Sequence, residues 1–197
     1  MPPPLTPPED SVEVTTLAEW RTWLQSNHTQ RPSVWLVTYK KGGRRPHLEY
    51  DDAVSEALCW GWIDSLPRKL DAERTMLRFS PRSKNTGWSA LNKQRATRMI
   101  RVHRMQPAGL AKVTAAKSDG SWSRLDVVEA LAVPADLATA FGTHAGSAPA
   151  FEAFPRSVKR GILEWIQAAK RPETRAKRIE ETAALAAQGK RANQWRV

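Results

Sequence analysis

The chain has 197 residues, of which 41% are hydrophobic and 26% charged, and its 31 lysines and arginines against 20 acidic residues give a net charge of +11. A chain of this length and composition can bury a core, which excludes disorder throughout, a collagen-like fibre and a coiled coil. Its single cysteine excludes an internal disulfide framework and a zinc site of several cysteines.

Residues 1–14 are expected to form a disordered tail, because five of the first eight residues are prolines, and proline favours an extended, solvated chain. This segment lacks the basic start and the apolar run of a secretory signal. No apolar stretch approaches the roughly 18–20 residues that are needed to span a bilayer. We therefore expect a protein without a membrane span that acts in the cytoplasm.

Residues 15–122 are predicted to form an α+β core domain. A helix is expected over 15–27, where Thr15 or Thr16 can cap the first turn and an apolar stripe follows at helical spacing. A second helix should begin at Asp51. Runs that are rich in β-branched and aromatic residues, or that alternate in polarity, predict strands over 34–39, 62–66 and 75–80. The sequence therefore predicts a small mixed sheet of about three strands packed by helices.

The chain after this sheet is predicted to be helical. Helices are expected over 89–103, with Ser89 as the cap, and over 108–117. Residues 123–150 are rich in Ala, Ser, Gly and Pro and are expected to form a linker with one short helix. The remaining elements are a C-terminal helical pair within 151–190 and a tail over 191–197.

The positive charge is concentrated in the middle of the chain. From Arg74 to Ser118 there are eleven basic residues and no acidic one, and four of them share one face of the helix over 89–103. Trp88 interrupts this run and could stack on a base. A basic face can also be an ordinary solvated surface. The residues expected to contact nucleic acid or another polyanion are Lys40, Lys41, Arg44, Arg45, Arg82, Trp88, Lys93, Arg98, Arg101 and Arg104.

No sequence-reading motif accompanies this charge: a helix-turn-helix with a clear glycine turn, RNP aromatics and a zinc finger are all missing from the sequence. Binding is therefore expected to run through phosphates, with little base specificity. Signatures of dinucleotide, P-loop, zinc-protease and serine-hydrolase sites are missing as well. The four histidines are scattered, and Cys59 is expected to be a buried, inert thiol. We expect no cofactor and no metal, and the sequence favours a non-enzymatic protein over an enzyme.

A second hypothesis is a small-molecule site or an enzyme. Trp60 and Trp62 flank a helix-to-strand junction that carries Asp64, and aromatic walls beside polar groups are typical of ligand pockets. Asp64 would act as acid or base and Arg82 as an anion clamp, with Ser89 and Asn92 as orienting groups. The competing structural interpretation places both tryptophans in the core, Asp64 in a turn and Ser89 at a helix cap.

Several blocks of the sequence carry a resemblance to a known family. They lie at 34–41, 56–65, 79–82, 88–92, 105–110 and 165–179. The most specific are Gly-Trp-Ile-Asp-Ser at 61–65 and Ala-Lys-Arg-Pro-Glu-Thr-Arg at 169–175. In these blocks, over about 15–190, the chain resembles the YdeI/OmpD-associated family, also called OmdA-like or bacteriocin-protection proteins. Trp60 stands where Phe is usual, and Ser80 where Thr is common.

The resemblance implies a bacterial protein linked to resistance against bacteriocins and cationic antimicrobial peptides, and some members are described as periplasmic or porin-associated. It implies no enzymatic activity whose residues could be carried over. The net charge of this chain opposes direct capture of cationic peptides. We therefore expect a non-enzymatic, cytoplasmic stress or antimicrobial-resistance protein that binds a polyanion, with nucleic acid as the favoured partner, through its basic helices.

Overall fold

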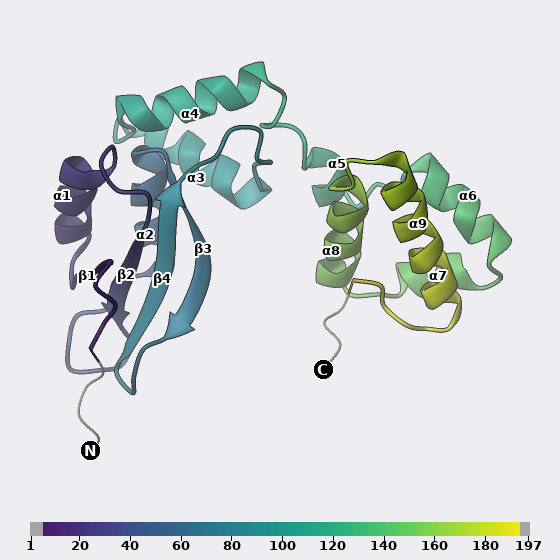
Figure 1. Cartoon of the computed structure of the whole chain (residues 1–197), viewed down its shortest axis with the longest axis horizontal. Helices are drawn as coiled ribbons and strands as arrows, with labels where there is room; N and C mark the ends of the chain where they lie inside the picture. The colour runs from purple at the N-terminus through teal and green to yellow at the C-terminus, as the bar shows by residue number, and fades with distance from the viewer. Residues whose placement is uncertain (1–5, 194–197) are drawn as a thin grey trace. The chain divides into compact units, whose positions relative to one another are not determined.

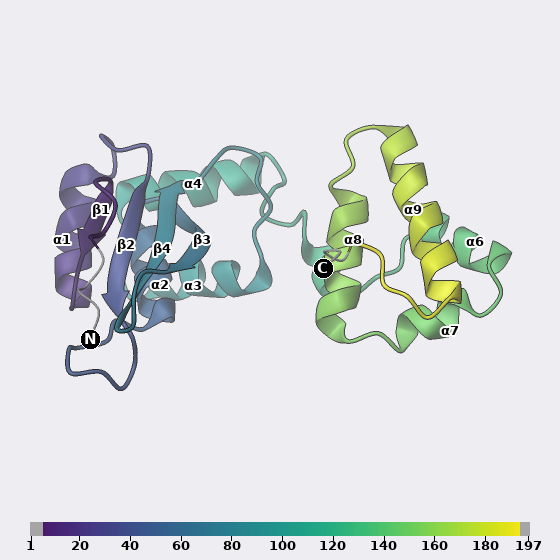
Figure 2. The same cartoon turned by 60° about the horizontal axis from the view of Figure 1, so that its bottom comes forward.

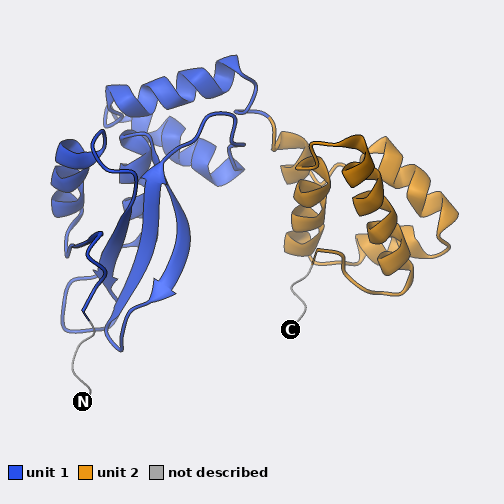
Figure 3. Ribbon diagram, in the orientation of Figure 1, with its two compact units in different colours: residues 1–123 blue, residues 124–197 orange. Residues whose placement is uncertain are grey.

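The computed structural model describes residues 6–193, and the chain divides into two compact units (Figure 3). Unit 1 is Met1–Ser123 and unit 2 is Arg124–Val197. Unit 1 combines a sheet with helices, whereas the described part of unit 2 consists of helices joined by loops (Figure 1). The predicted α+β class and the helical C-terminal segment are confirmed.

The sheet of unit 1 has four described strands in the order β1-β2-β4-β3, as Figure 2 shows from one edge to the other. Its strands are β1 (Ser11–Glu13), β2 (Val34–Tyr39), β3 (Trp62–Lys69) and β4 (Arg74–Pro81). β1 runs parallel to β2, while the β2–β4 and β4–β3 pairs are antiparallel, so the sheet is mixed as predicted.

The tail prediction is wrong for residues 11–13, which form β1. Their backbone pairs with β2 from Ser11 opposite Trp35 to Glu13 opposite Val37, and the next residue, Val14, is buried in the core. A short segment of this kind becomes a strand because a neighbouring strand supplies hydrogen-bond partners. The prediction for residues 1–5 lies outside the described residues.

Helices cover one face of the sheet. The first helix has the capping box that the sequence predicted: Thr16 accepts a hydrogen bond from the Glu19 backbone, and the Glu19 side chain accepts from the Thr16 backbone. Side chains from two helices meet the strands in a core that includes Trp20, Leu36 and Val54. The helices of unit 1 are α1 (Leu17–Asn27), α2 (Tyr50–Cys59), α3 (Ala90–Arg101) and α4 (Pro107–Ser118).

The opposite face of the sheet carries a small cluster that includes Trp35, Val37 and Met76. The guanidinium groups of Arg68 and Arg78 lie 5.1 and 5.6 Å from the centre of the Trp35 ring. These arginines cover the tryptophan in place of a helix, which uses their apolar stems and planar heads together.

Unit 2 corrects the predicted linker over 123–150. This segment forms helices rather than a connection, because Leu137, Phe141 and Phe151 are buried in a core shared with Ile162. Ala192, in the predicted C-terminal tail, is buried in the same core, and residues 194–197 lie outside the described part of the chain. The helices are α5 (Asp126–Glu129), α6 (Ala135–Thr143), α7 (Ser147–Glu152), α8 (Arg156–Gln167) and α9 (Pro172–Ala187).

Candidate functional site

The basic face of α3 lines an open hollow of about 520 Å³, which we call the α3 groove. Ser89 caps the helix by accepting a hydrogen bond from the Asn92 backbone, and two arginines lie in its last turn. Three cationic side chains line the groove and no carboxylate does. The lining residues are Ala90, Lys93, Gln94, Thr97, Arg98, Arg101 and Trp122. The arrangement suits a chain of anions, because each cation can meet a phosphate.

Trp122 is the aromatic residue of the groove, and sequence reasoning missed it. Its ring is half-buried and packs on Trp88, with ring centres 5.0 Å apart. The ammonium groups of Lys93 and Lys117 lie 6.0 and 5.3 Å from the Trp122 ring centre. The signal available in the sequence was the position of Trp122 two residues after the Asp-Gly turn at 119–120, where a loop can present a side chain to solvent.

Trp88 itself is buried and cannot stack on a base, which corrects the sequence prediction. Arg82, also predicted to contact nucleic acid, is buried beside it, with its guanidinium carbon 4.0 Å from the Trp88 ring centre. The Nη2 group of Arg82 donates to the carbonyl oxygen of Gly87 at 2.6 Å. Burial lowers the pKa of Arg82 to about 10. Both residues therefore belong to the interior of unit 1.

Carboxylates from α2 neutralise part of the basic surface. Asp51 accepts hydrogen bonds from Arg95 and Arg98, each at 2.8 Å, and these bonds hold the pKa of Asp51 below its usual value. Buried Glu56 pairs with Arg104 at 3.1 Å. Arg98 still exposes 44% of its side chain. The ion pair therefore offsets part of its positive potential, and the side chain remains in the groove.

The basic loop after β2 does not line the α3 groove. The Lys40 ammonium donates to the carbonyl oxygens of Asp71 and Ala72, both at 2.8 Å, and so stabilises the turn between β3 and β4. Lys41 forms an exposed ion pair with Glu49. Arg44 and Arg45 are exposed, and Arg45 lies over the Tyr39 ring. This loop contacts the sheet, the turn between β3 and β4 and the residue before α2, and no contact with α3 is present among the described residues.

The four residues of the small-molecule hypothesis do not form one site. Arg82 is buried beside Trp88, and Ser89 caps α3. The side-chain amide oxygen of Asn92 accepts a hydrogen bond from the Arg95 guanidinium at 2.8 Å.

Asp64 lies instead in a separate pocket of about 450 Å³, where the Tyr50 hydroxyl donates to it at 2.7 Å. Trp60 and Trp62 are core residues, as the structural interpretation expected.

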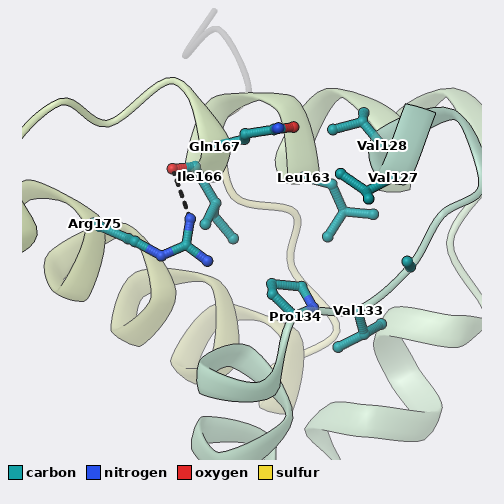
Figure 4. Close-up of a pocket in the computed structure, with 9 residues that line it drawn as sticks. Val127, Val128, Val133, Pro134, Leu163, Ile166, Gln167 and Arg175 are labelled. Carbon is teal, nitrogen blue, oxygen red and sulfur yellow. Dashed lines mark hydrogen bonds between the residues drawn. The ribbon is translucent and has the colours of Figure 1, made fainter. Parts of the chain in front are cut away.

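Unit 2 contains a smaller pocket of about 280 Å³ between α5, the segment before α6, α8 and α9 (Figure 4). Its walls are mostly apolar, with Leu163 and Ile166 from α8. Arg175, at the end of the Ala-Lys-Arg-Pro-Glu-Thr-Arg block, also lines it. The Arg175 guanidinium binds both carboxylate oxygens of Asp136, at 2.7 and 3.0 Å, and its Nη1 group lies 3.5 Å from the Ile166 carbonyl oxygen. These contacts engage the arginine in joining α9, α8 and α6.

The remaining polar candidates give no chemical site. Cys59 is buried, and burial raises the pKa of its thiol to about 12, as expected for an inert thiol. Within residues 6–193, no three His, Cys, Asp or Glu side chains gather to hold a metal ion. No helix in that part of the chain is long and apolar enough to cross a membrane.

Two families match the chain, each over a different unit. Residues 12–112 match a family described as a domain of unknown function, DUF8412. Residues 130–189 match the family described as "Bacteriocin-protection, YdeI or OmpD-Associated", OmdA, which confirms the predicted family. This match lies within unit 2 rather than over nearly the whole chain, and the blocks between 34 and 110 lie in the other match. Neither curated proteins nor solved structures gave a match.

Proposed function

We propose that this chain, which belongs to the DUF8412 family and carries an OmdA segment, binds single-stranded nucleic acid in the α3 groove without catalysis. The observation that carries the proposal is the groove lining: Lys93, Arg98, Arg101 and a half-buried tryptophan, with no carboxylate. Cations track a phosphate backbone, and an aromatic ring stacks on unpaired bases of any sequence.

The biological setting belongs to the same proposal. A nucleic-acid partner fits a protein that acts in the cytoplasm. The family description of the C-terminal segment names bacteriocin protection, so we place the binding in a stress or antimicrobial-resistance response. The net charge of +11 favours association with any polyanion, so the experiment must separate groove binding from general attraction.

The test is fluorescence anisotropy with a labelled single-stranded oligonucleotide of about 20 nucleotides at about 50 mM salt. Lys93→Glu combined with Arg101→Glu should weaken binding at least tenfold, because repulsion replaces two phosphate contacts. The matched control, Lys170→Glu with Lys177→Glu, makes the same charge change on exposed residues of unit 2. This control should change the affinity by no more than about twofold, since long-range attraction between exposed charges is screened by salt.

Two further measurements sharpen the result. Trp122→Ala should weaken binding by about 1–3 kcal/mol if one base stacks there, while Trp122→Phe should retain part of the affinity. The groove cations contribute a slope of about −2 to log K against log salt, from three contacts at −0.7 each. Undetectable binding at low salt, or an equal loss in the groove and control variants, would refute the proposal.

A further inference from the structure

The second pocket of unit 1, which we call the Asp64 pocket, is lined by residues of β2, β3, β4 and α2 and of the loop before α2. Leu36 comes from β2, Leu77 from β4, and Ala53 from the first turns of α2. Leu48, from the loop before α2, adds to the apolar lining. A volume of about 450 Å³ falls in the range of small-molecule sites, which are mostly apolar with a few placed polar groups.

The pairing of β3 with β4 places the carboxylate on the side of the sheet that carries this pocket. Asp64 pairs with Phe79 and Pro67 with Leu77, so the register shifts by one residue between the two pairs. Residues directly opposite in an antiparallel pair share a face, and Phe79 is fully buried in the core. Asp64 therefore lies on the helix-covered face of the sheet.

Asp64 differs from three other acidic side chains of unit 1 in its partners. Asp51, Glu56 and Asp71 each form ion pairs with arginines. Asp64 accepts one hydrogen bond, from the Tyr50 hydroxyl to Oδ2, and no ion pair to it is recorded among residues 6–193. The chain has 31 lysines and arginines, yet none of those in the described residues forms an ion pair with this half-buried carboxylate. Asp64 is therefore available to a cationic ligand.

Tyr50 is held in place as a donor to this carboxylate. The Arg95 guanidinium lies 5.4 Å from the Tyr50 ring centre and is itself fixed by Asp51 and Asn92. Partial desolvation of its hydroxyl and the hydrogen bond to Asp64 raise the pKa of Tyr50 to about 12. The hydroxyl therefore stays protonated near neutral pH and donates to Oδ2, which leaves Oδ1 of Asp64 to accept from a ligand.

We propose that the Asp64 pocket binds an organic cation, namely a protonated primary amine on an apolar body. The ammonium group would donate to Asp64 in a charge-assisted hydrogen bond, and the apolar body would contact Leu36, Leu48 and Leu77. An anionic ligand would meet the like charge of Asp64. This activity is separate from nucleic-acid binding in the α3 groove, because the two sites have different lining residues.

The experiment uses the full chain with 2-phenylethylamine as the probe and 2-phenylethanol as a neutral analogue of nearly the same shape. Amide chemical shifts are followed by NMR at about pH 7, where the amine is protonated. The amine should shift the resonances of residues around Tyr50, Asp64 and Leu77, with an affinity at least tenfold higher than that of the alcohol.

Variants test whether the carboxylate is responsible. Asp64→Asn keeps an acceptor for the Tyr50 hydroxyl and should weaken amine binding at least tenfold, with no change for the alcohol. Asp52→Asn is the matched control: it removes the same charge from the first turn of α2, at a residue that does not line the pocket, and should leave binding unchanged.

The proposal fails under any of three outcomes. The alcohol could bind as well as the amine, or Asp64→Asn could leave amine binding intact. The amine could also fail to shift these resonances up to about 20 mM, a concentration that detects even millimolar affinity. Wild-type-like spectra of Asp64→Asn without ligand would establish that a loss of binding does not come from unfolding.

Discussion

The guanidinium group of Arg82 lies 4.0 Å from the centre of the Trp88 indole ring, and both side chains are buried. No carboxylate accompanies this arginine: its recorded side-chain contacts in the described part of the chain are the ring and the carbonyl oxygens of Thr86 and Gly87. A buried cation over an indole face gains about 2 kcal/mol. The pair thus holds a charge in the core that the ring partly compensates.

A double-mutant cycle tests this coupling. Trp88→Leu should lower the free energy of unfolding by about 3–5 kcal/mol, because it leaves a cavity and an uncompensated charge. Arg82→Met should have a much smaller effect, since losing the ring and carbonyl contacts is offset by removing a buried charge. In the Arg82→Met background, Trp88→Leu should cost about 2 kcal/mol less. Urea denaturation measures each value, and simple additivity would contradict the argument.

Gly109 lies where α4 meets the end of α2, and its replacement should be destabilising. A Cβ atom there would lie 2.3 Å from the Cys59 carbonyl oxygen and 2.6 Å from that of Leu58. Both are backbone atoms, so a helix must shift. We expect Gly109→Ala to lower stability by about 1–3 kcal/mol, the usual range for overpacking.

The control for Gly109 is Gly161 in α8, where an added Cβ would meet nothing within 4 Å. Alanine inside an open helix stabilises by about 0.5–1 kcal/mol relative to glycine. Thermal unfolding should therefore shift in opposite directions for the two variants. A rise in the Tm of unit 1 on Gly109→Ala would show that the close approach is not rigid.

Local signals in the sequence predicted much of the fold. Thr16 and Glu19 form the predicted capping box, and the β-rich run of Val34–Tyr39 forms a strand. The errors lie where structure depends on distant partners. Ser11–Glu13 becomes a strand through its pairing with β2, and the Ala-rich segment after unit 1 becomes helical through burial of residues such as Phe141.

The site was harder to predict, because charge pairing and burial join residues far apart in the sequence. The run from Arg74 to Ser118 contains no acidic residue, yet Asp51 comes from α2 to pair with Arg98. The sequence also did not show which of the two tryptophans is exposed: Trp88 is buried, and Trp122 lines the groove. Composition therefore located the basic region but not the residues that face solvent.

Asp51 should control part of the acid stability of unit 1. Hydrogen bonds from Arg95 and Arg98 lower its pKa in the folded state. A lowered pKa stabilises the fold above the unfolded pKa, near 3.8, and this contribution is lost as pH falls through the folded pKa. Asp51→Asn should flatten the stability profile below about pH 4 and lower the Tm at neutral pH, because buried Arg95 loses a charged partner. Asp52→Asn serves as the comparison, and an equal change there would contradict this assignment.

Cys59 should be unreactive in the folded protein. Burial is the main cause that raises the pKa of its thiol to about 12, so almost no thiolate exists near neutral pH. Alkylation by iodoacetamide should proceed only on unfolding, and its rate in urea should follow the unfolded fraction. Because the unfolded thiol ionises near pH 9, its contribution to stability is complete below that pH and is lost as pH rises toward 12. Rapid labelling under native conditions would contradict this burial.

Unit 2 should fold as an isolated fragment of residues 124–197, because its described helices share a core of their own. The ion pair between Arg175 and Asp136 and the hydrogen bond from Gln167 to the Arg124 carbonyl oxygen both lie within the fragment. The fragment should give dispersed NMR spectra and cooperative urea unfolding. The complementary fragment, residues 1–123, holds every lining residue of the α3 groove, so it should retain the oligonucleotide affinity of the full chain. If binding is lost although this fragment is folded, unit 2 contributes to the interface.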